Sequence, residues 1–184
     1  SPYEARALAT WLEKKNAERQ SLTNKALTKA RQQVLARGIQ PILIAGDSEF
    51  PGGICGLVAS RLAEEFYRPV VVIRVGAQFS GGSCRSIPEF NIILALNQCR
   101  RLLSNFGGHS QAAGFTLPTK NLTRLTQYLS QMATTQLAGV DLRPQLDIDA
   151  EVTLPDVGGD TFRITRQLAP FGRGNPVPAF ISRG

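Results

Sequence analysis

Arginine and serine occur together in a glycine-containing stretch of the chain, a combination that suits phosphate binding. The stretch covers residues 80–87 and reads SGGSCRSI. An arginine guanidinium forms a planar fork that binds two phosphate oxygens at once, and serine hydroxyls add further donors. Ser83, Arg85 and Ser86 are therefore candidate phosphate-binding residues. The same residues are also typical of a hairpin tip that carries a surface arginine, so both interpretations stand.

A second stretch contains the only histidine of the chain, His109, and reads FGGHSQAAG over residues 106–114. An imidazole N–H beside glycines can donate to an anion, and small residues let a ligand approach the main chain. A lone histidine also commonly packs in a core or faces solvent. A metal site among its neighbours is disfavoured, because no aspartate or glutamate occurs between Phe90 and Thr116. The candidate residues of this stretch are Gly107, Gly108, His109, Ala112, Ala113 and Gly114.

A third glycine-containing stretch, EFPGGICG at residues 49–56, fits a tight turn from strand to helix as well as an anion-binding loop. Its spacing matches neither the G-x-G-x-x-G dinucleotide pattern nor the Walker pattern. The sequence offers no cluster of carboxylates and histidines for two metal ions and no G-x-S-x-G nucleophile element. We therefore expect a binding portion rather than a complete active site.

Composition limits the possible classes of protein. The 184 residues are 42% hydrophobic and 19% charged, which is typical of a folded globular domain. A net charge of +7 favours a polyanionic partner, although a solvated basic surface gives the same balance. The three cysteines form no C-x-x-C pair, which disfavours disulfides and zinc and favours a reducing, cytoplasmic setting. The apolar runs are far shorter than the roughly 20 residues of a membrane span, so we expect no membrane association.

Hydrophobic periodicity predicts an α/β fold, with a mixed β-sheet flanked by helices and a long N-terminal connector helix. Residues 4–37 contain neither proline nor glycine, so they should form that single long helix. A strand, a glycine turn, a helix and a strand follow, which predicts two parallel strands with a right-handed connection. The predicted strands cover residues 40–46, 70–75, 77–87, 113–117 and 144–154, and the further helices lie within residues 52–69, 88–104, 119–137 (capped by Thr119) and 161–168.

The nonapeptide GGHSQAAGF resembles the G-G-H-x-x-A-A-G signature of the DHH-associated domain, the smaller domain of the DHH phosphoesterase superfamily. The segments GGICGLVASRL, YRPVVVI, GSCRSI and PFGRGNPVPAF are similar to those of RecJ-type single-stranded-DNA exonucleases. The resemblance extends through nearly the whole chain and implies the C-terminal part of such an enzyme. It implies a bridging helix at 1–37, a substrate-binding α/β domain at 38–140, and a strand-helix extension at 141–184 that leads toward an oligonucleotide-binding barrel.

The resemblance also implies a function, namely the substrate-binding portion of a cytoplasmic 5′-to-3′ single-stranded-DNA exonuclease in recombination and repair. In that family a DHH domain holds two divalent cations, Mn or Mg, and its metal-binding residues are not in this sequence. The chain alone should therefore bind no metal and be inactive. Single-stranded DNA and the DHH domain are the expected partners. The alternatives are an oligonucleotide or cyclic-dinucleotide phosphodiesterase of the same superfamily and an RNA-binding module like that of alanyl-tRNA synthetases.

Individual residues match the family's motifs. The arginine and serine that follow its G-S motif, here Arg85 and Ser86, are implied to contact phosphates, as are the glycines and histidine at residues 107–109. One departure concerns the first glycine stretch. Many relatives have an aromatic residue and a histidine before it, whereas this chain has Phe50 and Pro51, so no histidine role is transferred to that loop.

Overall fold

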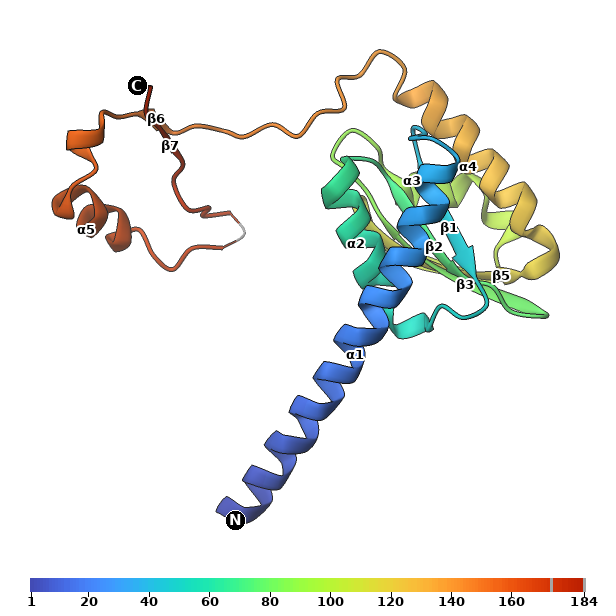
Figure 1. Cartoon of the computed structure of the whole chain (residues 1–184). Helices are drawn as coiled ribbons and strands as arrows, with labels where there is room; N and C mark the ends of the chain where they lie inside the picture. The colour runs from blue at the N-terminus through green and yellow to red at the C-terminus, as the bar shows by residue number, and fades with distance from the viewer. Residues whose placement is uncertain (173, 184) are drawn as a thin grey trace. The chain divides into compact units, whose positions relative to one another are not determined.

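The computed structural model of the chain describes residues 1–172 and 174–183. It divides into two compact units, Ser1–Leu142 and Arg143–Gly184, which are described here separately. The first unit contains the long helix and a five-stranded mixed sheet flanked by helices (Figure 1). The predicted fold class is therefore confirmed.

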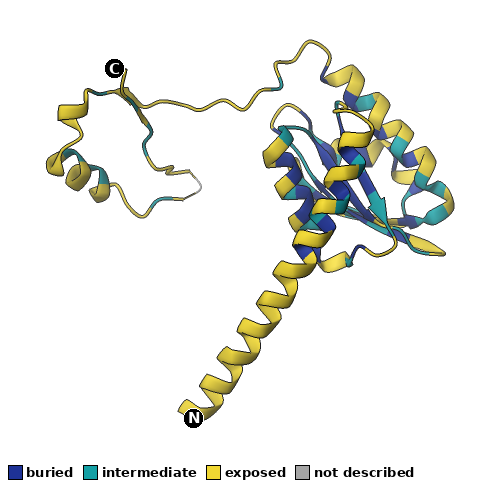
Figure 2. Ribbon diagram, viewed as in Figure 1, coloured by how far each residue is buried: buried dark blue, intermediate teal, exposed yellow. Residues whose placement is uncertain are grey.

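Helix α1 (Pro2–Ala36) is the predicted long helix, and only its C-terminal part packs against the domain. Ser1 caps its first turn in a capping box with Glu4, and the chain turns away at Gly38, whose φ is +72°. Thr23 is its first buried residue, whereas the preceding residues are exposed, Trp11 among them (Figure 2). The exposed part forms a rod that leaves the domain.

The sheet has the strand order β1-β2-β3-β5-β4. Strand β1 runs parallel to β2 through the predicted crossover helix α2, and the other neighbours are antiparallel. The βαβ prediction is thus confirmed. The elements that follow α1 are β1 (Leu43–Asp47), η1 (Gly52–Ile54), α2 (Cys55–Phe66), β2 (Val70–Arg74), β3 (Phe79–Arg85), α3 (Ile92–Gln98), η2 (Arg100–Leu102), β4 (Asn105–His109), β5 (Ala112–Pro118), η3 (Thr119–Asn121) and α4 (Leu122–Gln136).

Each face of the sheet buries its own hydrophobic core. Alternate residues of a strand point to opposite faces, so Val70 and Val72 pack with α1 and α2, whereas Val71 and Ile73 pack with α3 and α4. Figure 1 shows these helix pairs on the two sides of the sheet. The domain therefore has three layers, and its binding surfaces must lie where a sheet face extends beyond the helices.

Helix α1 is joined to the edge strand β1 by three polar side chains spaced four residues apart. Lys29 forms ion pairs with Asp47 and Glu49, both at 2.7 Å. Gln33 accepts a hydrogen bond from the Gly46 N–H at 3.0 Å and donates one to the Gly46 carbonyl at 3.2 Å. The third residue, Arg37, donates to the Ile44 carbonyl at 2.9 Å. Gln33 and Arg37 thus satisfy main-chain groups that an edge strand would otherwise expose, and Lys29 adds ion pairs to carboxylates at the end of β1.

Two helix predictions need correction. The helix predicted over residues 88–104 is shorter, because Asn91 caps α3 by accepting from the Leu94 N–H and a 3₁₀ turn replaces its end. Thr119 does not cap α4. Its hydroxyl donates to the Gly76 carbonyl and lies 2.9 Å from the Ser80 hydroxyl, so it joins η3 to β3 and to the connection that precedes β3.

The second unit contains short elements only, namely β6 (Ala150–Glu151), η4 (Leu154–Asp156), α5 (Gly159–Gln167) and β7 (Phe180–Ile181). The predicted helix at 161–168 corresponds to α5. The strand predicted over 144–154 is wrong apart from β6, which pairs in parallel with β7. Arg173, within the PFGRGNPVPAF segment, and Gly184 lie outside the described residues. Among the described helices of the chain, none has the length and apolar character that crossing a membrane requires.

Candidate nucleic-acid interface

The strand predicted over residues 77–87 is confirmed as β3, whereas residues 106–109, for which no strand was predicted, also lie in a strand. Residues 80–85 belong to β3, which lies between β2 and β5, so Arg85 is not at a hairpin tip. Residues 106–109 belong to β4, and β5 begins at Ala112, which leaves Ser110 and Gln111 as the turn between them. The correction matters because strand pairing fixes which side chains share a face.

Strand register places the donors of both stretches on one face. Arg85 lies opposite Ala112, and Ala112 lies opposite His109. Residues directly opposite each other in antiparallel strands point to the same side. The same pairing places Gly114 between Ser83 of β3 and Gly107 of β4. We call this surface the open face, and its residues are Gly81, Ser83, Arg85, Gly107, His109, Ala112 and Gly114.

Helix packing on this side of the sheet stops at β3. Helix α2 contacts β2 and β3, whereas β5 alternates between buried residues on the core side and half-exposed or exposed residues on the open face. His109 and Gly107 are exposed, and Ser83 and Arg85 are half-buried. A ligand can therefore reach the open face from solvent.

The guanidinium of Arg85 is held against the first turn of α2. Its Nη1 donates to the Cys84 carbonyl at 2.8 Å, and its Nη2 would lie only 3.2 Å from a Cβ added at Gly56. The guanidinium therefore packs closely against Gly56. None of the ion pairs within the described residues involves Arg85, so no carboxylate competes with an anion for its guanidinium.

Three glycines of the open face are not required by packing inside the domain. A Cβ added at Gly107 would meet nothing within 4 Å, and one added at Gly81 or Gly114 would make only an ordinary contact of 3.7 Å with a carbonyl oxygen. Glycine inside a strand costs stability and is typical of places where a ligand or another main chain comes close. These glycines make the open face flat.

Gly82 and Gly108, by contrast, are required by the fold itself. A Cβ at Gly82 would collide with the Phe115 ring. Gly108 has a φ of +141°, and a Cβ there would collide with the Ala112 carbonyl oxygen. The sequence gives no means of separating these two structural glycines from the three exposed ones.

The structure separates three predicted site residues from the open face. Ala113 is buried in the core formed with α3 and α4, on the opposite side of the sheet. Gly108 shapes the end of β4. Ser86 lies beyond the end of β3, where its hydroxyl donates to the Phe90 carbonyl at 2.6 Å and its N–H donates to the Gln111 carbonyl at 2.8 Å. Ser86 therefore holds the hairpin turn next to Arg85 and His109.

Arg74 is a residue of this side of the sheet that the sequence analysis did not single out. It lies opposite Gly81, at the end of β2, and is exposed. It borders a pocket of about 320 Å³ that also includes Ser83. The sequence does contain one indication that Arg74 is unusual, because it is the one charged residue of the apolar segment VVVIRV.

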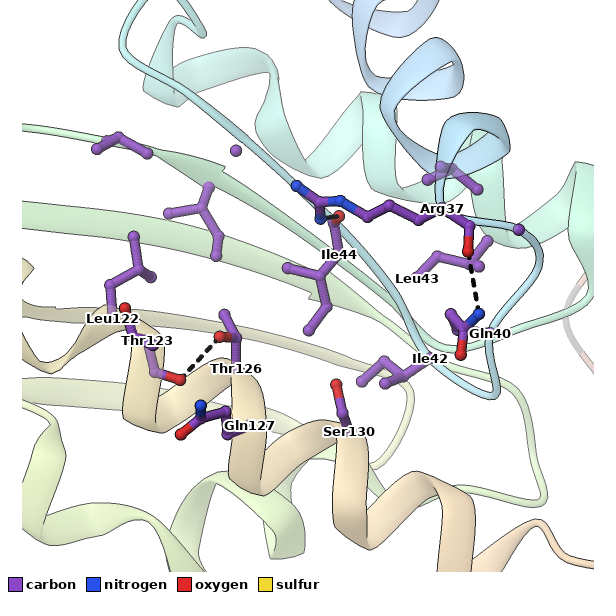
Figure 3. Close-up of a pocket in the computed structure, with 15 residues that line it drawn as sticks. Arg37, Gln40, Ile42, Leu43, Ile44, Leu122, Thr123, Thr126, Gln127 and Ser130 are labelled. Carbon is purple, nitrogen blue, oxygen red and sulfur yellow. Dashed lines mark hydrogen bonds between the residues drawn. The ribbon is translucent and has the colours of Figure 1, made fainter.

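A larger pocket, of about 580 Å³, lies between β1, α4 and the end of α1 (Figure 3). Arg37 crosses it to reach the Ile44 carbonyl, and Thr123, Thr126 and Ser130 of α4 lie on its other side. None of the predicted site residues lines it. The open face, rather than this pocket, gathers the candidate residues.

The segment that includes β4 and β5 contains no acidic residue. Between Phe90 and Val140 the sequence has no aspartate or glutamate, so no carboxylate of this segment opposes an anion on the open face. A divalent metal does not fit here, because no group of three or more His, Cys, Asp or Glu side chains converges anywhere in the described part of the chain. The surface offers donors for an anion and no carboxylate ligands for a cation.

The cysteine between Ser83 and Arg85 points away from the open face. Cys84 packs in the core on the opposite side, and its burial raises the pKa of the thiol to about 12. Burial also raises the pKa of Cys55 and Cys99, and all three are free thiols. These thiols are therefore poor nucleophiles.

Known proteins resemble the chain along almost its full length. It is 33% identical over 179 residues to the single-stranded-DNA-specific exonuclease RecJ of Bacillus subtilis, a match that covers 96% of this chain and 23% of that protein. The crystal structure of RecJ with Mn²⁺ from Thermus thermophilus matches 99% of this chain and 27% of that one, with a TM-score of 0.88 and 30% identity. The corresponding structure with Mg²⁺ matches 98% and 28%, with a TM-score of 0.84 and 28% identity.

The chain spans about a quarter of the length of these relatives. The family signature was predicted from the segment around His109, and the match now extends across α1 and the sheet. The DHHA1 domain family matches residues 32–135, which include every strand of the five-stranded sheet and the whole open face. This chain belongs to the DHHA1 domain family.

Proposed function

We propose that this chain is the substrate-binding portion of a 5′-to-3′ single-stranded-DNA exonuclease that acts in recombination and repair in the cytoplasm. The observation that carries the proposal is the open face, where Ser83, Arg85 and His109 surround flat, glycine-rich main chain. The names of the RecJ relatives support the choice of single-stranded DNA as the substrate. The same surface would bind the sugar-phosphate backbone, which every DNA sequence shares.

The geometry suits a strand that passes over β5. Arg85 and His109 belong to the strands on either side of Ala112, so their Cα atoms lie about 10 Å apart, or two strand spacings. A backbone lying over Ala112 and Gly114 would have a donor on each side. The small residues beneath it allow close approach, and Arg85 supplies a charged fork for the phosphate oxygens.

The role of the chain in hydrolysis is to hold and orient the strand. RecJ of Thermus thermophilus was crystallised with Mn²⁺ and with Mg²⁺, so we propose that a divalent metal serves the parent enzyme. A DHH domain would supply its ligands, because the described residues of this chain do not fit a metal site. When bound there, such a metal polarises the phosphate and activates water. The chain by itself should not cleave DNA.

Binding is the first test. Fluorescence anisotropy with a labelled single-stranded oligonucleotide should show weak binding by the chain, and Arg85→Ala and His109→Ala should each weaken it. Arg124→Ala is the matched control, because Arg124 is exposed on α4, which packs on the other side of the sheet. Equal binding by the chain and by the Arg85→Ala/His109→Ala double variant would disprove the site. Unlabelled RNA and cyclic dinucleotides as competitors would show which polyanion is preferred.

Catalysis is the second test. The purified chain with Mn²⁺ should leave a 5′-phosphorylated oligonucleotide intact, since binding residues alone provide no activated nucleophile. Addition of a DHH domain from a RecJ relative, joined through α1, should restore digestion from the 5′ end. Digestion by the chain alone, with contaminating nuclease excluded, would contradict the proposed division of labour.

A further inference from the structure

A pocket of about 320 Å³ lies next to the open face, at the end away from His109. It occupies the space between the start of α2, the end of β2 and the first half of β3. No aspartate or glutamate is among the described residues that line it. Its lining residues are Gly52, Cys55, Arg74, Gly81, Gly82, Ser83 and Phe115.

Arg74 is the charged group of this pocket. It lies opposite Gly81, and Val72 lies opposite Ser83, so Arg74 points to the same side of the sheet as Ser83 and Arg85. Its side chain is exposed, and none of the ion pairs in the described part of the chain involves it. Its cross-strand partner on β1, Asp47, is ion-paired with Lys29 at 2.7 Å rather than with Arg74, so Arg74 is available to an anion from outside.

Arg74 and Arg85 both lie against the segment that leads into α2. Arg85 is the partner of Val70, so the two arginines start four residues apart along the ladder, at about 13 Å. Arg74 lies beside Gly52 of η1, and Arg85 lies beside Gly56 in the first turn of α2. The Arg74 Nε lies 4.0 Å from the position of a Cβ at Gly52, and the Arg85 Nη2 lies 3.2 Å from one at Gly56. Ser83 lies between the two arginines along β3.

We propose that Arg74 and this pocket form a second phosphate subsite, which takes a different phosphodiester group of the same DNA strand from the one that Arg85 binds. The inference rests on the proposed function, because it assumes that the strand lies on the open face. Ser83 is placed to donate to either phosphate. The two subsites together run along β3, so they fix the line on which the strand lies as well as its position.

The experiment measures the salt dependence of single-stranded DNA binding by the whole chain. The probe is a labelled oligothymidylate, and the readout is anisotropy between about 50 and 200 mM salt. Each phosphate contact to a single strand contributes about −0.7 to the log-log slope, so Arg74→Ala should make the slope shallower by about 0.7. The affinity at low salt should fall on the order of tenfold. Arg74→Lys should keep the slope but bind less tightly, because it retains the charge and loses the fork.

The controls separate this inference from the proposed function. Arg85→Ala should reduce the slope by a similar amount, and Arg124→Ala should leave it unchanged. An unchanged slope for Arg74→Ala together with a reduced one for Arg85→Ala would overturn the second subsite and leave the proposed function standing. Unchanged slopes for both would overturn the proposed function itself. A slope for Arg74→Lys as shallow as that for Arg74→Ala would overturn the ionic contact. Circular dichroism should show all four variants folded, since Arg74 and Arg124 are exposed and Arg85 is half-buried.

Discussion

Arg85 and His109 are both cross-strand partners of Ala112, one on each side of β5. The two donors therefore face the same direction with only a methyl group between them. Nearly all of their separation is fixed by strand spacing, which does not depend on loop conformation. The middle position should consequently matter to binding although it offers no polar group.

Ala112→Leu tests that middle position. Ala112 is half-exposed and points to the open face, so a larger side chain can extend into solvent without disturbing the core. We expect a native fold and a loss of single-stranded DNA binding at least as large as that of Arg85→Ala, because leucine would occupy the space of the DNA backbone. Anisotropy measures the loss. Thr134→Leu, at an exposed position of α4, is the control, and equal binding by Ala112→Leu would show that the strand lies elsewhere.

Gly107 and Gly108 are adjacent, yet the same substitution should have opposite effects on stability. Gly107→Ala should leave the free energy of unfolding unchanged or raise it by about 0.4–1 kcal/mol, because it restricts the unfolded chain and meets nothing in the folded one. Gly108→Ala should lower it by more than about 1 kcal/mol, because of its positive φ and the collision with Ala112. Urea unfolding measures both. If Gly107→Ala is stable and still binds DNA normally, then close approach at Gly107 is disproved.

Gln33 and Gln32 offer a comparable pair on α1. Gln33→Leu would remove both hydrogen bonds to the main chain of Gly46, and we expect a loss of about 1–3 kcal/mol in unfolding free energy because the strand groups stay partly buried. Gln32 is exposed, so Gln32→Leu should change stability little. Urea unfolding again decides, and equal values for the two variants would show that the edge of β1 does not need the clamp.

The pair of Lys29 and Asp47 predicts part of the acid sensitivity of the domain. The ammonium of Lys29 and the Glu49 N–H lower the pKa of Asp47 below its ordinary value of 3.8. A depressed carboxylate pKa stabilises the folded state above the ordinary value, and this stability is lost as the pH falls through the folded-state pKa. Asp47→Asn should therefore lose stability near neutral pH and show a smaller further loss below about pH 4 than the wild type. Identical pH profiles would contradict the pairing.

Lys29, the other partner of this ion pair, affects the stability of the folded state at high pH. Asp47, and then Glu49, raise the pKa of Lys29, so its contribution is complete below the ordinary lysine pKa and is lost as the pH rises through the folded-state value. Near neutral pH both partners are charged, which is where the clamp on β1 is strongest.

Cys84 should be inert in the folded protein. Its pKa of about 12 leaves almost no thiolate at about pH 8, and its side chain is inaccessible. Mass spectrometry after iodoacetamide treatment should find Cys84 unlabelled in the native chain and all three cysteines labelled in concentrated urea. Rapid native labelling of Cys84 would show that β3 opens readily.

The sequence was sufficient to predict the long helix, the parallel βαβ unit and the family, because each depends on local signals. It contains no proline or glycine from residue 4 to residue 37, and the GGHSQAAGF segment is specific. The sequence did not reveal that Ala113 is a core residue. Successive side chains of β5 point to opposite faces of the sheet, and Ala113 lies on the core side. That outcome depends on strand pairing, which joins residues far apart in the chain. The glycines beside His109 had suggested a loop, but Gly107 lies inside β4, on the open face.

Arg74 was missed for a related reason. It ends an apolar segment, and only the antiparallel pairing of β2 with β3 brings it next to Gly81 and Ser83. The strand predicted over residues 144–154 is an error of the opposite kind, because the local pattern is present but most of the strand is not. Its apolar and polar residues alternate, but β6 consists of only Ala150 and Glu151, since alternation alone supplies no partner strand.

The length of the exposed part of α1, before Thr23, determines both the direction and the distance of anything joined to its amino end, relative to the domain. A single residue inserted there would leave the buried positions and the clamp on β1 in register, so the domain would fold as before. It would also turn whatever is joined at the amino end by about 100° and move it by about 1.5 Å. Seven inserted residues would restore the direction to within about 20°. Seven residues would at the same time move the joined body by about 10.5 Å, so direction and distance respond differently to the length of this rod.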